Sequence, residues 1–181
     1  ALLLKQVPLE VKINVASFDG GYNSFQPLRA KSRQDMLDMI CVGLGGRAAE
    51  SLVFGPNACT TGAQSDLKQA TADASAFVRK HAFADRWSRT DVGVEVDCEV
   101  NTAVDATNEL VEQILSSQFS RAHALLQEHA ALLSEVAGLL SRDGEVSRER
   151  MGALFGLAVT EDPAVVAPYA ARLAEFGRRH G

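Results

Sequence analysis

The chain has 181 residues, of which 46% are hydrophobic and 23% are charged, so it is long enough to bury the core of one domain. Its net charge is −5 and its basic residues are scattered, which argues against a nucleic-acid partner held through the phosphate backbone. The longest apolar runs fall well short of the roughly 18 residues that a membrane-spanning helix needs, so we expect no transmembrane helix.

The cysteines and the first residues bear on the cellular setting. Cys41, Cys59 and Cys98 are odd in number and widely spaced, and none belongs to a CxxC pair. A reduced interior therefore suits them better than a disulfide framework or a cysteine metal site. The chain begins with Ala1 and an apolar run, Leu2 to Leu4, which favours a processed or truncated N-terminus.

The first element is a predicted strand. From Leu9 to Phe18 apolar and polar residues alternate, which is typical of a half-buried strand. Residues 19–23 read Asp-Gly-Gly-Tyr-Asn and supply the positive-φ residues of a turn. The sequence therefore predicts a small strand or hairpin near residues 9–27.

A helix of about five turns is predicted next, between Ser32 as N-cap and a stop at Gly55. Its apolar positions recur at helical spacing: Leu37, Ile40, Cys41, Leu44, Ala48 and Leu52. Gly43, Gly45 and Gly46 each cost roughly 1 kcal/mol relative to Ala in a helix. We therefore expect a neighbouring helix to approach the backbone there.

A second helix begins in the stretch T-T-G-A-Q-S-D-L-K-Q-A-T, residues 60–71. Thr61 and Gln64 are spaced as a capping box. The apolar stripe of this helix comprises Leu67, Ala70, Ala74, Phe77 and Val78. Asp66 lies in the first turn, where an acid complements the helix dipole by about 0.3–1 kcal/mol. That role alone would account for Asp66 without any ligand.

The remaining sequence is predicted to be helical after an acidic loop. Three further helices are expected up to Leu157, one of them closed by Asp143-Gly144, and a terminal Ala-rich helix is expected over Pro163–Arg179. This gives the following organisation: a partial core over 1–85, a loop over 86–101, a C-terminal helical part of the same domain over 102–158, and an extra terminal helix or tail over 159–181.

Two neighbouring motifs carry a family resemblance. G-G-R-A-A-E-S-L-V-F-G (residues 45–55) followed by the 60–71 stretch resembles the peptidase domain of the FtsH-type AAA zinc metalloproteases. The resemblance implies a mainly α FtsH-type peptidase-domain fold with a small β hairpin near the N-terminus and a C-terminal helical bundle. The variants I-C-V-G-L-G-G-R and T-T-G-A-Q are most similar to the mitochondrial inner-membrane members, which implies a mitochondrial, inner-membrane-associated protein, with chloroplast or bacterial membranes as alternatives.

The resemblance also implies a zinc-ligand position. In that family zinc is held by two histidines of an HExxH helix, whose glutamate is the general base, and by an aspartate that corresponds to Asp66. The other positions that match the family motifs are Gly45, Gly46, Arg47, Glu50, Thr60, Thr61 and Gly62. Glu50 either supports the metal site from behind, or is a charge on the helix surface, or pairs with Arg47.

The 181 residues contain no HExxH. Their histidines are His81, His123, His129 and His180, and no two lie at i and i+4. Aligned on Pro8, the family motif would fall just before Ala1. Ser17, Ser24 and Cys59 have no adjacent base, so no catalytic residue is assigned. We expect no cofactor in this chain, and zinc only if an upstream segment supplies HExxH.

Two functional hypotheses remain open. One is a peptidase fold without a complete zinc site, a non-catalytic structural subunit of a larger mitochondrial membrane assembly. It is favoured by residues 16–25, A-S-F-D-G-G-Y-N-S-F, which differ from the family pattern at the strand edge that receives substrate in that family. It predicts that other protein chains, or Leu2 to Leu4, cover the helix faces that carry Leu44, Ala48, Leu67 and Ala70. The alternative is the C-terminal part of an active ATP-dependent zinc metalloendopeptidase for membrane-protein quality control, favoured by the retention of Asp66.

Overall fold

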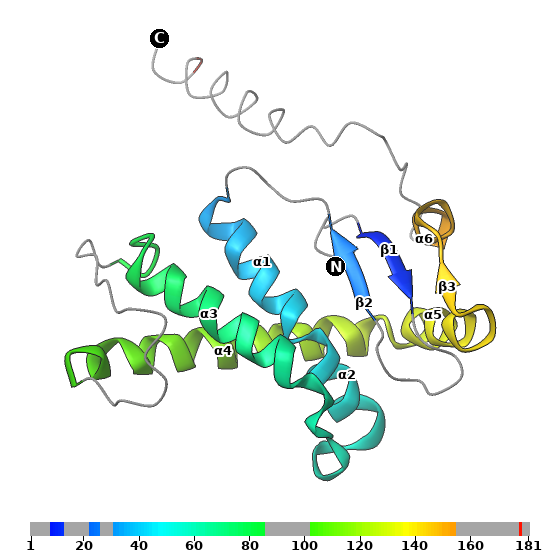
Figure 1. Ribbon diagram of the computed structural model, residues 1–181, viewed down its shortest axis with the longest axis horizontal. Helices are drawn as coiled ribbons and strands as arrows, with labels where there is room; N and C mark the ends of the chain where they lie inside the picture. The colour runs from blue at the N-terminus through cyan, green and yellow to red at the C-terminus, as the bar shows by residue number, and fades with distance from the viewer. Residues whose placement is uncertain (1–7, 13–21, 26–30, 86–101, 155–177, 179–181) are drawn as a thin grey trace. The chain divides into compact units, whose positions relative to one another are not determined.

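The structure is a computed structural model in which helices dominate (Figure 1). It describes residues 8–12, 22–25, 31–85, 102–154 and 178. The described residues fall into two compact units, the first with 31–85 and 102–138 and the second with 8–12, 22–25 and 139–154. The predicted mainly α class is confirmed. The predicted loop over 86–101 and the terminal helix, apart from Arg178, lie outside the described residues.

In the first unit, helix α1 spans Arg33–Gly43 and helix α2 spans Gly45–Phe54. Ser32 caps α1 as predicted, because its side chain accepts from the Asp35 backbone and its own backbone N–H donates to the Asp35 carboxylate at 2.8 Å. The capping box therefore fixes where α1 begins.

The single five-turn helix expected over this stretch is wrong. The chain leaves regular helix at Leu44, whose ψ is −7°, and α2 starts at the next residue. Gly43 and Gly45 flank this joint, and glycines tolerate such a departure because they lack a β-carbon. Gly55, with φ of 83°, then ends α2 where the stop was predicted.

The third helix follows two short 3-10 turns. Turn η2 spans Pro56–Ala58, turn η3 spans Thr61–Ala63, and helix α3 spans Gln64–Arg79. The predicted apolar stripe of α3 is confirmed. Ala70, Ala74, Phe77 and Val78 are buried, and Leu67 is half-buried at the edge of the stripe.

Helix α4, Thr102–Glu128, is the longest element and packs against α1, α2 and α3 (Figure 1). The larger buried cluster of this unit comprises Met36, Ile40, Leu44, Ala70, Ala74, Phe77, Val78 and Val111. A second cluster comprises Cys41, Ala48 and Ala122. Because one helix supplies residues to both clusters, α4 closes the core over three helices at once.

This packing corrects the expectation that the motif helices need another chain to cover them; Leu2 to Leu4, the other expected cover, lie outside the described residues. Leu44, Ala48 and Ala70 are at most 3% exposed within the described structure. The reason is the length of α4, whose apolar face extends far enough to bury what was expected to lie open. Only the half-buried Leu67 keeps part of its surface accessible.

Arg79 ties the end of α3 to the start of α4. Its Nε donates to Thr107 Oγ1 at 2.9 Å and its Nη2 donates to Asn108 Oδ1 at 2.7 Å. Its Nη1 donates to Ser75 Oγ at 2.8 Å, one turn earlier on α3. Partial burial lowers the pKa of Arg79 from its usual range, and these three acceptors compensate for the lost hydration.

The second unit contains a three-stranded antiparallel sheet in the order β2-β1-β3. Strand β1 spans Pro8–Lys12, β2 spans Tyr22–Phe25 and β3 spans Glu145–Val146. Val11 pairs with Asn23 on one side and with Val146 on the other. The predicted hairpin is confirmed, although β1 ends at Lys12, beyond which the predicted strand lies outside the described residues. Strand β3 was not predicted, because two residues carry no periodicity.

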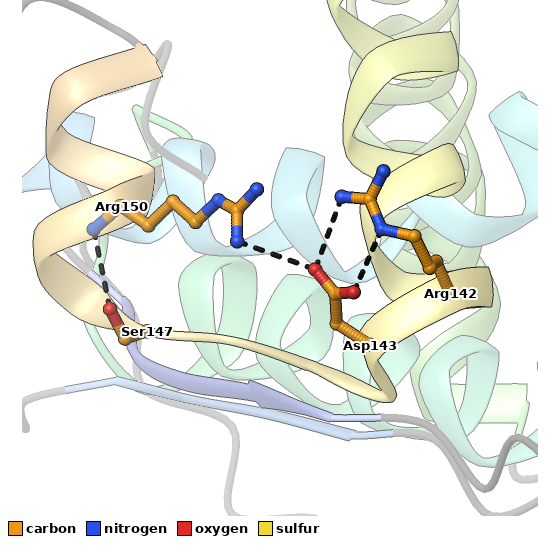
Figure 2. A network of polar contacts seen from close by, with 4 residues as sticks. All are labelled: Arg142, Asp143, Ser147 and Arg150. Carbon is orange, nitrogen blue, oxygen red and sulfur yellow. Dashed lines mark hydrogen bonds and ion pairs between the residues drawn. The ribbon is translucent and has the colours of Figure 1, made fainter.

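Helix α5, Ala130–Asp143, ends as predicted at Gly144, whose φ is 77°. Helix α6, Arg148–Leu154, begins behind Ser147, which accepts from the Arg150 backbone N–H at 3.3 Å. Figure 2 shows how the corner between the two helices is held. The Asp143 carboxylate accepts from Arg142 at 2.8 Å and 3.2 Å and from Arg150 at 3.3 Å.

Candidate metal-ligand site

The joint between α1 and α2 lies against the first turn of α3. A β-carbon at Gly43 would lie 3.6 Å from Ala70 Cβ and 3.8 Å from the Asp66 carbonyl oxygen. One at Gly46 would lie 3.8 Å from Asp66 Oδ2. The expected helix approach is therefore present at these two positions, at ordinary van der Waals distance. Gly45 meets nothing within 4 Å and does not take part.

Asp66 is exposed at the start of α3. Among the described residues it makes no hydrogen bond and no ion pair. Its carboxylate therefore keeps all of its acceptor sites free for a donor or a cation from elsewhere. The same position also lets it interact with the helix dipole, so the simple electrostatic role remains compatible with the geometry.

The turn before Asp66 is capped one residue earlier than predicted. Thr60, not Thr61, is the cap: its Oγ1 accepts from the Gly62 backbone N–H at 3.2 Å. Helix α3 itself begins after Ala63 with no side-chain cap, so the predicted capping box of Thr61 and Gln64 is wrong. The cause is η3, which inserts a tighter turn between the threonines and the α-helix. A β-carbon at Gly62 would lie 3.2 Å from the Thr60 hydroxyl, which favours glycine there.

Arg47 and Glu50 of α2 both contact Thr60. Arg47 Nη2 donates to the Thr60 carbonyl at 2.6 Å, and the Thr60 hydroxyl donates to Glu50 Oε1 at 2.7 Å. Glu50 Oε2 is buried and accepts no hydrogen bond among the described residues, yet it lies 3.3 Å from Arg47 Nη1. We regard this contact as an ion pair of imperfect angle, so Glu50 pairs with Arg47 rather than standing as a lone surface charge.

The contacts to Thr60 were not predicted from the sequence. The spacing of Arg47 and Glu50, one helical turn apart, was the available signal for their ion pair. Nothing in the spacing indicates that both residues reach a turn ten or more residues further along the chain. The family motifs singled out Arg47, Glu50 and Thr60 separately, and the contacts that join them appear only in the structure.

The structure brings no histidine to Asp66 among the described residues. His81 stacks on Phe83 with ring centroids 5.7 Å apart, and the ring centroids of His123 and Phe119 lie 6.4 Å apart. Within the same residues, no three histidine, cysteine or acidic side chains gather as a metal site. The Asp66 carboxylate has the chemistry and exposure of one zinc ligand, whereas a catalytic zinc takes three protein ligands. The described residues therefore fit one ligand position and not a whole site.

Residues 16–154, well over half of the chain, match Peptidase family M41. The chain belongs to this peptidase family. The match confirms the resemblance to the FtsH-type peptidase domain and covers α1 to α6, including both motif helices. The matched part also includes Asp66 and the residues that contact Thr60.

Curated relatives agree with this membership. The chain is 34% identical over 118 residues to the ATP-dependent zinc metalloprotease YME1L of Drosophila melanogaster, covering 60% of this chain and 16% of the relative. It is 30% identical over 153 residues to the ATP-dependent zinc metalloprotease FtsH of Synechococcus sp. (strain JA-2-3B'a(2-13)), covering 75% and 24%. It is 34% identical over 134 residues to the ATP-dependent zinc metalloprotease FtsH 1 of Salinibacter ruber, covering 69% and 19%. The chain thus spans between a sixth and a quarter of these relatives.

Among the described helices, none is both long and apolar enough to cross a membrane. Two cysteines of the described part, Cys41 and Cys59, are free thiols. Burial raises the pKa of the Cys41 thiol above its usual value, with the nearby Arg121 acting in the opposite direction. Cys98 lies outside the described residues.

Proposed function

We propose that this chain is a peptidase-fold domain that presents the Asp66 carboxylate as one ligand of a zinc site, with the other ligands supplied from outside these 181 residues. The single observation that carries the proposal is the exposed, unpaired Asp66 carboxylate at the start of α3, behind a turn that side chains of α2 hold. The relatives are named as ATP-dependent zinc metalloproteases, which supports zinc as the metal.

The test is the metal content of the protein purified with its natural partners. We expect stoichiometric zinc in the wild type and loss of zinc in Asp66→Asn. Asp73→Asn is the matched control, because Asp73 lies on the same helix and makes no hydrogen bond or ion pair among the described residues. Zinc that persists in Asp66→Asn, or a wild-type assembly without zinc, would overturn the proposal.

A second measurement, the free energy of unfolding of Asp66→Asn, distinguishes loss of the zinc ligand from loss of the fold. Asp66 contributes through the helix dipole alone when no metal is bound, so Asp66→Asn is expected to cost within about 1 kcal/mol. Circular dichroism with urea, performed on metal-free protein, measures this cost.

A second candidate is a non-catalytic structural subunit, and one observation favours it. The larger buried cluster holds α3 against α1 and α4 through apolar contacts, so the frame around Asp66 needs no metal to form. For this candidate we expect a folded, zinc-free chain in the natural assembly, with Asp66→Asn leaving assembly unchanged. The same metal measurement therefore separates the two candidates.

We also propose that residues 1–85 and 102–158 form one domain, and that the chain works in a mitochondrial, inner-membrane-associated assembly with other protein chains. The motif variants near Gly45 and Thr60 support the location, and chloroplast or bacterial membranes are the alternatives. Val53 and Phe54 are 59% and 68% exposed at the end of α2, which supports a protein partner. Cell fractionation of the tagged protein tests the location, and size-exclusion chromatography tests the association with other protein chains.

A further inference from the structure

We propose that Arg47 and Glu50 are positioning residues that hold the Asp66-bearing turn in place, an inference that rests on the proposed function of Asp66. The three residues Arg47, Glu50 and Thr60 form a closed ring of contacts. Arg47 donates to the Thr60 carbonyl at 2.6 Å, and Glu50 accepts from the Thr60 hydroxyl at 2.7 Å. Arg47 Nη1 lies 3.3 Å from Glu50 Oε2. Thr60 is thus held through its backbone and its side chain together.

The Thr60 hydroxyl has two roles that depend on each other. It donates its only proton to Glu50 Oε1 and accepts from the Gly62 backbone N–H. A hydroxyl has one donor and two acceptor sites, so committing the proton to the carboxylate directs a lone pair toward Gly62. Glu50 therefore orients the cap of η3 as well as contacting it.

The backbone between Thr60 and Asp66 is continuously helical. Turn η3 ends at Ala63 and α3 starts at Gln64, so every residue between Thr61 and Asp66 is helical. On the other side, a β-carbon at Gly43 would lie 3.8 Å from the Asp66 carbonyl oxygen and one at Gly46 would lie 3.8 Å from Asp66 Oδ2, so the α1–α2 joint faces Asp66 closely. The turn that carries Asp66 is consequently bonded to α2 at Thr60 and faces the α1–α2 joint at Asp66.

The ring is not needed for the core. The side chains of Arg47 and Glu50 are 22% and 23% exposed and belong to neither buried cluster. Partly exposed ion pairs of this kind contribute modestly to global stability, even though Glu50 Oε2 itself is buried. We therefore expect their loss to loosen the turn locally while the packed helices remain.

The test uses Arg47→Met and Glu50→Ala in the protein purified with its natural partners. Two quantities are measured: amide hydrogen exchange over residues 61–67, and the zinc dissociation constant by competition with a chelating dye. We expect faster exchange in that segment, unchanged exchange in α4, and about tenfold weaker zinc binding. Glu50→Gln keeps an acceptor for the Thr60 hydroxyl and should recover part of both losses. Arg142→Met, which removes an exposed ion pair elsewhere, is the control.

The outcomes separate the two proposals. If the wild type holds no zinc, the proposed function fails. If the wild type holds zinc through Asp66 but Arg47→Met and Glu50→Ala leave its affinity unchanged, only the positioning role is overturned, whether or not exchange rises. If both variants unfold globally, Thr60→Val, which keeps the shape and removes the hydroxyl, replaces them, and unchanged exchange and affinity in that variant overturn the role.

Discussion

The Arg121 guanidinium of α4 lies 2.7 Å from the Asp38 carboxylate of α1, beside the buried contact between the two helices. Asp38 is 9% exposed and also accepts from Gln34 at 2.7 Å, so its charge depends on groups of this chain rather than on water. Arg121 keeps about a third of its side chain exposed. The sequence gives no hint of this pair, since 83 positions separate an acid and a base that each look like surface charges.

We predict that Arg121→Met lowers the free energy of unfolding by about 1–3 kcal/mol, because it leaves a buried carboxylate without its cation. Urea unfolding followed by circular dichroism measures this. In the double variant with Asp38→Asn the losses should be clearly less than additive. Arg142→Met, which breaks an exposed pair, should have a smaller effect, and an equal effect would contradict the prediction.

Gly43 sets a size limit on the α1–α3 contact. A β-carbon there would lie 3.6 Å from Ala70 Cβ, which is ordinary contact, so Gly43→Ala should raise the free energy of unfolding by about 0.5–1 kcal/mol through helix propensity. Gly43→Leu should lower it by about 1–3 kcal/mol, since the longer side chain has no room against α3. Gly45→Ala meets no neighbour within 4 Å and serves as the propensity control. A destabilised Gly43→Ala would show that the contact is tighter than described.

Cys41 and Cys59 should differ in reactivity toward maleimide. Cys41 is 2% exposed and its thiol pKa is raised by burial, so little thiolate forms and little reagent reaches it. Cys59 is half-buried and should be labelled in the native state. In a Cys98→Ser background, mass spectrometry of the labelled peptides gives both rates. Labelling of Cys41 as fast as Cys59 before unfolding would mean that α4 does not cover it.

The corner drawn in Figure 2 should weaken in acid. The hydrogen bond from Arg142 lowers the pKa of the Asp143 carboxyl below its usual value, with a further charge effect from Arg142 and Arg150. A lowered folded-state pKa means that the stabilisation is present above about pH 4, the unfolded value, and is lost as the pH falls through the folded value. The difference in urea midpoint between wild type and Asp143→Asn should therefore shrink between pH 7 and pH 3. Asp73→Asn is the control, and a difference independent of pH would contradict this origin.

Features with a local cause could be predicted from the sequence. Ser32 and Asp35 satisfy neighbouring backbone groups three residues apart, so the start of α1 was visible. Gly144 has the positive φ that ends α5, and the stripe from Ala70 to Val78 has helical spacing. Asp66 became a candidate zinc ligand only because the motif around it resembles a family motif, and periodicity alone would have left it as an ordinary acid in a first turn.

Features with a distant cause could not be predicted. The break between α1 and α2 at Leu44 leaves no trace in the hydrophobic spacing, and the cap at Thr60 is accompanied by contacts of Arg47 and Glu50 from α2. The burial of Leu44 and Ala48 depends on α4, more than fifty positions later. These choices are decided by tertiary contacts, and a pattern within one helix carries no information about them.

Because α4 packs against three helices, the chain can be cut into two fragments that should still bind each other. A fragment ending at residue 85 would leave Ile40, Phe77 and Val78 without part of their cover and should aggregate. Supplied together with a second fragment that begins at Thr102, it should be rescued as a non-covalent pair, because Arg79 and the apolar face of α4 meet the first fragment directly. Such a pair would let either half be labelled or exchanged independently of the other.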